Sequence, residues 1–458
     1  MAAQSVFVPR IAAGYSHSVS LRSTGTVATH GENRSGEIGD GTTTGRLSPV
    51  YLAPPASQIW AQVAAGDFRS TALTTTGDMY SWGSNGYGQL GDGTLTDHRT
   101  PFLVARPAGT SWAGVAAGFG HTLALCTNGQ LYTWGDNSYG QLGMGTQTTT
   151  LARQLISAPA GQSWAQVAAG YNFSLALCTN GALYTWGSNT DGQLGDGTTT
   201  NRPVPVLVPA PAGRTWVQVA AGFWSAAALC SDGALYTWGN NYSGQLGTGT
   251  TTGQLLPVRL APPTGQRWLQ VAVGYAHMLA VCADGSLYGW GDNYRGQLGD
   301  GTNTGRSTPV RVPPPHGKQW VQVAAGYYHS LALASDGQVY GSGYNYSGQL
   351  GDGTNQNANC FGRICNALAT ATEVSSLSAN AAPNPFNSEL QITPNQVTPG
   401  PVSLALYTSL GQCVRHEAYA HILVNQQVVL SGLASLPPGF YVLQLTTPQG
   451  RQVLRLMH

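Results

Sequence analysis

The sequence repeats itself with a constant period of 52 residues. The tripeptide Gln-Leu-Gly, or a close variant of it, occurs once in every period. Its final glycines are Gly39, Gly91, Gly143, Gly195, Gly247, Gly299 and Gly351. The glycine of a second motif, Ala-Ala-Gly, keeps the same step from Gly14 to Gly326. Seven copies therefore cover residues 5–368 without an insertion or deletion. In such an array each copy is one small unit that buries its apolar faces against its neighbours.

Each copy predicts four short β-strands. In the third copy "SWAGVAAG" is short and apolar, "HTLALC" alternates and "LYTWG" is rich in β-formers, while Asn128-Gly129 favours a type I′ hairpin. A fourth strand follows a Thr-rich loop, as at residues 309–312, where a leading proline fits an edge strand. Seven four-stranded sheets bury both their faces by packing radially. The predicted fold class is therefore all-β, a seven-bladed propeller.

Eleven tryptophans recur at two positions of the repeat. They are Trp60, Trp112, Trp164, Trp216, Trp268 and Trp320 at the first, and Trp82, Trp134, Trp186, Trp238 and Trp290 at the second. A large aromatic side chain buries about 150–250 Å². Because these side chains recur at matched depth, we predict that they pack between blades and do not stack on a ligand.

The sequence lacks the motifs of common enzymes. One copy contains Gly-x-Gly-x-x-Gly, at Gly86, Gly88 and Gly91. A dinucleotide-binding loop needs this pattern between a parallel strand and a helix, and no helical periodicity follows it here. Gly-x-Ser-x-Gly, His-Glu-x-x-His and Walker A motifs do not occur. We therefore expect no cofactor and no enzymatic activity.

The composition argues against two classes of partner. Only 9% of the residues are charged and the net charge is +1, so no basic field exists to attract nucleic acid. No apolar run reaches the 18 residues of a membrane span, so we expect no transmembrane segment.

Histidines and aspartates recur in the repeat as candidate metal ligands. His17, His121, His277 and His329 share one position, and a ring of imidazoles could hold a metal. However, this position is spread around a wide channel, so a structural histidine bonded to a neighbouring backbone group is the favoured interpretation. The aspartates of "GDGT" are Asp40, Asp92, Asp196, Asp300 and Asp352, and they fit an Asx-type turn better than calcium. We expect no metal.

Six of the seven cysteines fall into two groups. Cys126, Cys178, Cys230 and Cys282 occupy one position in successive copies, and we expect them to be buried as small hydrophobic residues. Cys360 and Cys365 flank the final strand and are candidates for a disulfide in an oxidising compartment. A regular strand would instead point two residues five apart to opposite faces.

The residues that vary between copies are the candidates for binding. They follow each Ala-Ala-Gly motif or lie at the tips of the next loops, where Tyr, Trp and Phe are frequent. We select Phe68, Arg69, Tyr171, Phe173, Trp224, Tyr275, Tyr327 and Tyr328 from the first group, and Tyr87, Tyr139, Tyr242, Tyr294 and Tyr346 from the second. Propeller loops gather on the end faces, so we predict an aromatic, charge-poor face that binds a protein or a glycan. The alternative is that these residues only fill the mouth of the channel.

The composition changes after the seventh copy. Residues 369–380 are small and polar and are predicted to be a linker. Residues 381–458 contain short alternating segments, "LQIT", "VSLALYT", "YVLQLTT" and "QVLRLMH", separated by turn signals. We predict a small immunoglobulin-like β-sandwich.

Two family resemblances follow from these motifs. The pattern "VAAGxxHTLAL…GxLYTWGxNxxGQLGxGT" resembles the repeat of the regulator of chromosome condensation family, which implies a seven-bladed propeller over about four fifths of the chain. That family includes exchange factors for a small nuclear GTPase, a plant photoreceptor and secreted bacterial β-lactamase inhibitors. The fold therefore does not decide the function.

The tail resembles the type A C-terminal sorting domain of the type IX secretion system. The resemblance rests on Pro383, Asn384, Pro385, Phe386, Gly411, Leu436, Pro437, Gly439 and Tyr441. It implies a Bacteroidetes-type bacterium, contact with the secretion machinery and an extracellular or cell-surface location. The end, Met457-His458, departs from the basic end that is usual there. No export signal is visible at the N-terminus, so we expect either that the natural start lies upstream or that the sequence was trimmed; the alternative is a cytoplasmic protein.

These observations together predict a secreted, monomeric, non-enzymatic protein that binds a protein or a glycan. The alternative is guanine-nucleotide exchange, but exchange factors of the family use a projecting wedge, for which the unbroken 52-residue step leaves no room. Light sensing is a third hypothesis, although the photoreceptor's Gly-Trp-Arg-His-Thr pattern is missing. A hydrolase without a known motif is the fourth.

Overall fold

The structure is a computed structural model of the chain. It describes residues 10–22, 24–55, 58–315 and 318–364, and, in the tail, seven strands together with residues 433, 434 and 436. The described strands form two compact units, one containing β1–β28 and the other β29–β35.

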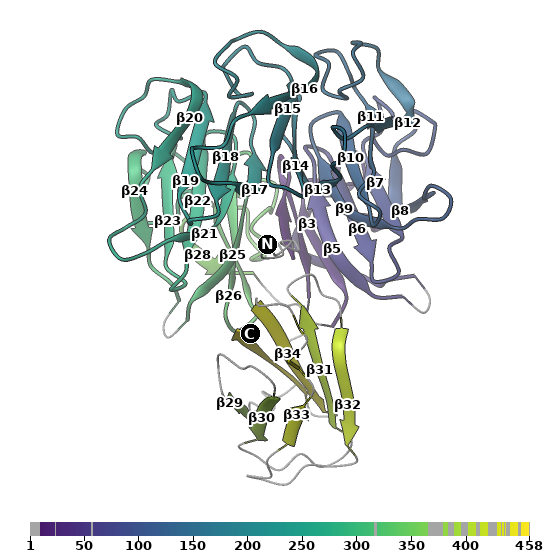
Figure 1. The fold of residues 1–458 in the computed structure, drawn as a ribbon, viewed down its shortest axis with the longest axis vertical. Coiled ribbons are helices and arrows are strands. Elements are labelled where there is room, and N and C mark those ends of the chain that lie inside the picture. Colours follow the sequence, from purple (N-terminus) through teal and green to yellow (C-terminus); the bar gives the residue numbers. More distant parts are fainter. Residues whose placement is uncertain are drawn as a thin grey trace. The chain divides into compact units, whose positions relative to one another are not determined.

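The first unit consists of seven four-stranded antiparallel sheets, the blades (Figure 1). Blades 1 to 4 contain β1 (Ile11–Ala13), β2 (His17–Leu21), β3 (Val27–Gly31), β4 (Arg46–Leu52); β5 (Trp60–Ala65), β6 (Arg69–Thr74), β7 (Met79–Gly83), β8 (His98–Val104); β9 (Trp112–Ala117), β10 (His121–Cys126), β11 (Leu131–Gly135), β12 (Thr150–Ile156); and β13 (Trp164–Ala169), β14 (Phe173–Cys178), β15 (Leu183–Gly187), β16 (Arg202–Val208). Blades 5 to 7 contain β17 (Trp216–Ala221), β18 (Ser225–Cys230), β19 (Leu235–Gly239), β20 (Gln254–Leu260); β21 (Trp268–Val273), β22 (His277–Cys282), β23 (Leu287–Gly291), β24 (Arg306–Val312); and β25 (Trp320–Ala325), β26 (His329–Ala334), β27 (Val339–Gly343), β28 (Ala358–Arg363).

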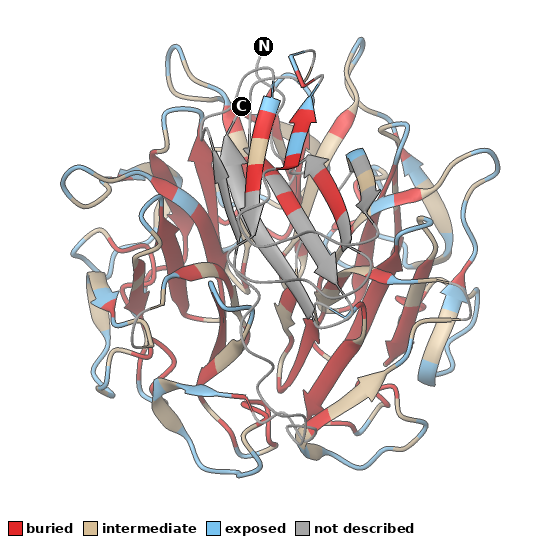
Figure 2. Cartoon of the chain, turned by 90° about the horizontal axis from the view of Figure 1, so that it is seen from below, coloured by how far each residue is buried: buried red, intermediate tan, exposed pale blue. Residues whose placement is uncertain are grey.

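The strands of each blade follow one another in sequence order, from the inner strand to the outer one. The second strand of every blade is buried along its whole length, whereas the outer strands are partly exposed (Figure 2). This gradient is what radial packing of seven sheets produces. The seven-bladed all-β prediction is confirmed.

The ring closes by packing of blade 7 against blade 1, and the two blades exchange no strand. The backbone N–H of Arg10, just before β1, donates to Gln322 Oε1 in β25 at 2.8 Å. The N–H of Tyr327 donates to the carbonyl of Gly14 at 3.3 Å. Each blade is therefore complete within its own repeat, as the unbroken period predicts.

The hairpins between second and third strands differ from the type I′ prediction, which is wrong. In blade 3 the N–H of Gly129 donates to the Cys126 carbonyl at 3.0 Å, and the N–H of Cys126 donates to the Gln130 carbonyl at 2.8 Å. These bonds enclose a three-residue loop in which Gly129 has a φ of 80°. Such loops combine a type I turn with a glycine in the left-handed region. Because Leu125 pairs with Leu131, the register leaves too many residues for a two-residue turn.

The fourth strands also begin earlier than predicted. The strand expected at residues 309–312 is β24, which starts at Arg306, so Pro309 lies inside it. Proline is tolerated there because β24 is the outer edge of its sheet, where an N–H is not needed for pairing. The edge assignment was thus correct and the strand start was wrong.

The tryptophans pack between blades, as predicted. All eleven are buried, and five of them donate an indole N–H across a blade boundary. Trp134 Nε1, for example, donates to the carbonyl of Gln89 in the preceding blade at 3.0 Å. The buried apolar clusters accordingly join residues of adjacent blades, such as Met79 of blade 2 with Trp112 of blade 3.

The boundary between blades 7 and 1 is built differently. The second tryptophan position holds His30 in blade 1, whose Nδ1 lies 3.2 Å from the Gly348 carbonyl. The buried cluster at this boundary contains only Ile11, Leu331, Leu333 and Ile364. It is the one propeller cluster, among the described residues, that contains no aromatic residue. We call it the closing seam.

The propeller has two different end faces. His121 pairs with Gly135, so the residues that precede the second strand and those that follow the third strand lie at the same end. We call this end the loop face, and the opposite end, with the hairpins, the hairpin face. Both ends of the propeller chain lie on the hairpin face, because Ile11 pairs with Ser20 and the N–H of Ile364 donates to the Val339 carbonyl.

The second unit contains two sheets around a shared core. The strands are β29 (Ala379–Ala382), β30 (Glu389–Pro394), β31 (Val402–Thr408), β32 (Cys413–Tyr419), β33 (Val428–Ser431), β34 (Phe440–Thr447) and β35 (Gly450–Met457). They form the sheets β29-β30-β33 and β32-β31-β34-β35. Leu390 and Leu430 of the first sheet share a buried cluster with Leu404 and Leu443 of the second. The immunoglobulin-like assignment stays a prediction.

Candidate functional site

Aromatic side chains gather on the loop face, around the axis of the propeller. Six blades place an aromatic residue directly after the Ala-Ala-Gly glycine or its equivalent, and these are Tyr15, Phe119, Tyr171, Phe223, Tyr275 and Tyr327. Their rings contact one another in turn, with centroids 4.5 Å apart for Phe119 and Tyr171 and 4.0 Å apart for Tyr275 and Tyr327. Phe223 also reaches Tyr327 at 4.9 Å. We call this group the axial plug.

A second group extends from the plug over blades 5 to 7. Trp224 lies 4.8 Å from Tyr275, and Tyr275 lies 5.3 Å from Tyr328. Tyr328 lies 6.5 Å from Tyr344, which is stacked on Tyr346 at 6.4 Å. These five residues and Tyr294 are the aromatic patch.

The guanidinium of Arg295 holds the rim of this patch together. It lies 5.2 Å from the ring centroid of Tyr294 and 5.2 Å from that of Tyr344. Cation–π contacts of this length favour a fixed arrangement of the rings. The patch therefore presents positioned aromatic surfaces, which lose little side-chain freedom when a partner binds.

The predicted loop-tip tyrosines differ in exposure. Tyr242, Tyr294 and Tyr346, on blades 5, 6 and 7, are 83%, 73% and 71% exposed. Tyr87 and Tyr139, on blades 2 and 3, are about half as exposed, and the ring of Tyr87 packs 5.8 Å from that of Phe119. The surface available to a partner is thus largest over blades 5 to 7.

The predicted residues near the axis fall into two classes. Phe68, Tyr171, Trp224, Tyr275, Tyr327 and Tyr328 are partly exposed on the loop face. Tyr327 is enclosed by its neighbours, and burial together with the Tyr275 and Tyr328 hydroxyls raises its pKa, so its hydroxyl stays neutral. Arg69 and Phe173 are buried between blades, so neither presents a side chain to a partner in this structure.

The position of Arg69 and Phe173 is that of the repeating histidines. Each of these histidines is buried, and its Nε2 lies about 3 Å from a serine hydroxyl of the next blade, as in His121 with Ser174 at 3.0 Å. The Ser174 hydroxyl donates to the Gln141 carbonyl at 2.8 Å. It must therefore accept a hydrogen bond from His121 Nε2, which fixes the neutral Nε2–H form. Burial lowers the pKa of His121 to about 3. The histidines are therefore structural, as predicted, but the predicted backbone partner is wrong, because Nε2 pairs with a serine hydroxyl.

The repeating aspartates and cysteines also have structural roles. Asp92 Oδ1 accepts the N–H of Thr94 at 2.9 Å, which is an Asx-type turn, and its Oδ2 lies 2.8 Å from His98 Nε2. Equivalent turns occur at Asp40, Asp196, Asp300 and Asp352. Cys126, Cys178, Cys230 and Cys282 are buried free thiols. Cys360 lies exposed in β28, whereas Cys365 lies outside the described residues, so the disulfide stays a prediction.

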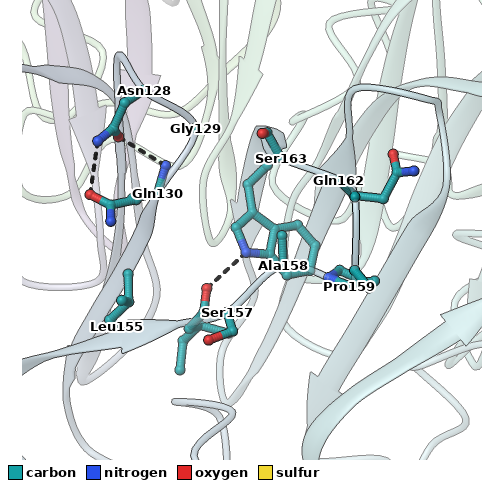
Figure 3. A pocket seen from close by; sticks show the side chains of 13 residues that line it. Asn128, Gly129, Gln130, Leu155, Ser157, Ala158, Pro159, Gln162 and Ser163 are labelled. Atoms are coloured by element: carbon teal, nitrogen blue, oxygen red, sulfur yellow. Dashed lines mark hydrogen bonds between the residues drawn. The ribbon is translucent and has the colours of Figure 1, made fainter.

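The hairpin face of blade 3 carries a groove of about 310 Å³ (Figure 3). Two of its polar side chains are hydrogen-bonded within the groove: Asn128 Nδ2 donates to Gln130 Oε1 at 2.9 Å, and Trp164 Nε1 donates to the backbone carbonyl of Ile156 at 2.9 Å. Among the described residues that line it, none holds a buried polar side-chain atom without a partner. The groove therefore gives no argument for a ligand.

Two residues of the predicted sorting motif are described. Tyr441 is buried in the tail's core, and Leu436 packs against that core. Pro383, Asn384, Pro385, Phe386, Gly411, Pro437 and Gly439 lie outside the described residues. The visible part of the motif therefore serves the packing of the tail.

Sequence reasoning did not select Tyr344, which links Tyr328 to Tyr346 in the patch. A signal for it exists in the repeat. It follows the glycine that ends the third strand, where other copies have Glu, Ser, Asp or Asn. An aromatic residue at this usually polar position indicates an enlarged aromatic surface on blade 7.

The part of the chain that the structure describes contains no helix long and apolar enough to cross a membrane. The same part contains no group of three or more His, Cys, Asp or Glu side chains that could hold a metal ion.

Comparison with protein-family models gives two matches. The RCC1-like domain matches residues 2–216 and 111–381, and the secretion system C-terminal sorting domain matches residues 380–457. The ultraviolet-B receptor UVR8 of Arabidopsis thaliana is 36% identical over 375 residues, which cover 81% of this chain and 85% of that protein. The human E3 ubiquitin-protein ligase HERC2 is 32% identical over 330 residues, which cover 71% of this chain but only 7% of HERC2.

Solved structures share the fold. Human WBSCR16 superimposes with a TM-score of 0.67 at 25% identity, over 74% of this chain and 94% of that one. Prp20p of Saccharomyces cerevisiae, described with its binding to Gsp1p and histones, gives a TM-score of 0.67 at 23% identity, over 83% of this chain and 90% of that one. At this identity the second likeness concerns the fold alone.

Proposed function

Because this chain belongs to the RCC1-like domain family and ends in a type IX secretion sorting domain, we propose that it is a non-enzymatic binding protein that recognises an extracellular protein through its aromatic patch. The sorting domain makes it an extracellular or cell-surface protein. The identity of its partner and the role of the patch are the proposed part.

One observation carries the proposal: the patch is continuous, partly exposed and confined to one end of three adjacent blades. Trp224, Tyr275, Tyr328, Tyr344 and Tyr346 form an unbroken chain of ring contacts. Tyrosine, tryptophan and arginine are the residues that most often dominate the energy of protein interfaces. A continuous patch with Arg295 at its rim has this composition. Filling the mouth of the channel requires only the axial plug, so the exposed rings of Tyr242, Tyr294 and Tyr346 are left for another role.

The architecture supports a display role. The chain leaves the propeller at Ile364 on the hairpin face, whereas the patch lies on the loop face. The described propeller chain therefore ends at the face opposite to the one that carries the patch.

The relatives support binding more than catalysis. UVR8 is a receptor, and its match covers most of both chains. HERC2 is a ligase, but the match covers only 7% of it, so the likeness gives no support for ligase activity in this chain. Nucleotide exchange is less well supported, because every blade here consists of the same four strands and the repeat has no insertion that could form a projecting wedge.

The test is capture of proteins from culture medium by the full-length protein on a resin. Wild type is compared with the double variant Trp224→Ala, Tyr328→Ala and with Leu207→Ala, which removes an exposed apolar side chain from the outer strand β16. We expect a protein that wild type and Leu207→Ala retain and that the double variant loses. Equal capture by all three would refute the role of the patch, and capture of polysaccharide in place of protein would assign the face to glycan.

A further inference from the structure

One position breaks the aromatic pattern around the axis. Blade 2 has Asp67 where the six other blades have the tyrosines and phenylalanines of the axial plug. The side chain of Asp67 is 8% exposed, and its Oδ2 has no hydrogen-bond partner in the described part of the chain. Burying a carboxylate oxygen without a partner is costly. Such an atom is therefore a candidate for contact with a ligand.

Asp67 lines a chamber of about 70 Å³ on the axis of the propeller. The ends of the inner strands from all seven blades form most of its wall, Ala-Gly in six blades and Val273-Gly274 in blade 6, and Tyr171 and Phe223 complete it. The plug is interrupted beside Asp67, since no ring contact joins Tyr15 to Phe119 among the described residues. The chamber thus combines an unpartnered carboxylate oxygen with two aromatic lining residues, beside a break in the ring contacts of the plug.

The charged neighbour of Asp67 is Arg69. Its guanidinium donates to the backbone carbonyls of Phe119 and His121 and forms no ion pair with Asp67 in the described structure. Burial raises the pKa of Asp67 to about 7, although the charge of Arg69 acts in the opposite direction. Burial lowers the pKa of Arg69 to about 9, so it remains charged at neutral pH. Tyr171, whose pKa is raised by burial and by Asp67, remains neutral.

We propose that this chamber binds an alkylammonium group, either the end of a lysine side chain of the partner or a free small amine. The first source rests on the proposed function, whereas the second does not. The Asp67 carboxylate accepts the N–H bonds of an ammonium group, and Tyr171 and Phe223, which line the chamber, contact its alkyl chain. An ammonium is compact, whereas a guanidinium is a broad plane with five donors that one carboxylate cannot pair.

The charge of Arg69 opposes a second cation, so binding is weak, with a Kd on the order of 1 mM. The affinity depends on pH because the carboxylate must be ionised. Since the pKa of Asp67 is about 7, we expect affinity to rise about tenfold from pH 6 to pH 8. The Arg69 and Tyr171 groups do not titrate in this interval.

The test uses the full-length protein and n-butylammonium chloride, followed by calorimetry. We expect Asp67→Asn to weaken binding at least tenfold and to remove its pH dependence. Asp191→Asn is the matched control: it removes one charge from the same face at a carboxylate that accepts a hydrogen bond from Asn240 and does not line the chamber. We expect its affinity to remain within twofold of wild type. A second variant, Tyr171→Leu, removes an aromatic ring from the lining of the chamber and should also weaken binding.

Four results would overturn the proposal: unchanged binding in Asp67→Asn, no binding of n-butylammonium by folded wild type, equal binding of n-butylguanidinium, or equal binding of sodium at the same ionic strength. The outcome is independent of the capture experiment. If the protein captures a partner through the patch but does not bind the amine, only the chamber proposal is refuted. If the amine binds in an Asp67-dependent manner but no protein is captured, the site is assigned to a free amine.

Discussion

His329 in blade 7 and Ser18 in blade 1 lie 311 residues apart in the sequence, and their Nε2 and Oγ atoms are 3.0 Å apart in the structure. The same histidine–serine contact links consecutive blades elsewhere in the ring, at His17 and Ser70, His121 and Ser174, and His277 and Ser330. Closure therefore reuses an interaction that elsewhere links consecutive blades. At the seam, however, it operates beside the apolar cluster that lacks aromatic residues.

Replacing Ser18 by alanine should loosen the seam. The variant Ser18→Ala leaves His329 Nε2 buried without a partner, which costs about 1–3 kcal/mol of unfolding free energy. Ser174→Ala removes the equivalent bond to His121 inside the ring and is the matched control. We expect similar losses in denaturant unfolding, but faster amide exchange in β1 and β25 only for Ser18→Ala. Equal exchange in both variants would argue that the seam is no weaker than other boundaries.

His30→Trp should strengthen the same boundary. In five other blades a tryptophan occupies this position. Its indole N–H donates to a backbone carbonyl of the preceding blade, that of the first residue of the Gln-Leu-Gly motif or its variant. For blade 1 the equivalent residue is Gln349. His30 and Trp82 place their rings against equivalent glycines of the preceding blade. A Cβ on Gly351 would lie 2.8 Å from the His30 ring, and a Cβ on Gly39 would lie 2.7 Å from the Trp82 ring.

The added buried apolar area should raise the unfolding free energy by about 1 kcal/mol or more. Thermal and denaturant unfolding measure this change. A lower stability would mean that the indole overpacks the seam.

Acid should destabilise the propeller through its buried histidines. Burial lowers the pKa to about 3 for His17, His121 and His329 and to about 4 for His30 and His277, against 6.5 for the free side chain. Below pH 6.5 the unfolded chain binds protons that the folded chain excludes, so stability falls as the pH drops toward 4. Glu37 and Asp67 act in the opposite direction, because their folded pKa values are raised to about 7.

Each proton that the unfolded chain takes up in excess contributes about 1.4 kcal/mol per pH unit. Five histidines outweigh two carboxyl groups, so denaturation at pH 7, 6 and 5 should give falling free energies of unfolding. The double variant His121→Phe, Ser174→Ala, which copies the Phe173 and Ala226 pair of blades 4 and 5, should reduce this slope. A slope equal to that of wild type would exclude His121 as a contributor.

The sequence predicts the blades well because the period specifies both the strands and their neighbours. The sequence also shows which histidines have a serine partner. Each of the four repeating histidines has a serine 53 residues later around the ring. Phe173 and Ser225, at the same position of the repeat as the histidines, have Ala226 and Met278 there instead. The hairpin type could not be read from Asn128-Gly129, because the pairing of Leu125 with Leu131 decides the loop length. Variation between copies identified loop-face tyrosines, but it equally marked Arg69 and Phe173, which face a neighbouring blade. The chamber at Asp67 depends on rings that converge from several blades, which a linear pattern does not show.

Glu37→Gln should stabilise the protein, and more so in alkali. Glu37 replaces the glutamine of the repeat and is buried; its Oε1 has no hydrogen-bond partner in the described part of the chain. Burial raises its pKa to about 7, so the group reduces stability as pH rises from about 4.5 to above 7. In blades 2 to 6 the glutamine Nε2 donates to a polar residue five positions earlier, as Gln141 does to Asp136 at 2.8 Å. Glu32 occupies that place in blade 1 and offers an acceptor to the new amide.

We expect a gain of about 2 kcal/mol in unfolding free energy at pH 8 and little change at pH 4, where the Glu37 carboxyl is protonated in both states. Denaturant unfolding at the two pH values measures the difference. Glu389→Gln, at an exposed glutamate of the tail strand β30, controls for the loss of one charge and should change neither value. A gain that is equal at both pH values would show that the new hydrogen bond, and not the removed buried charge, stabilises blade 1.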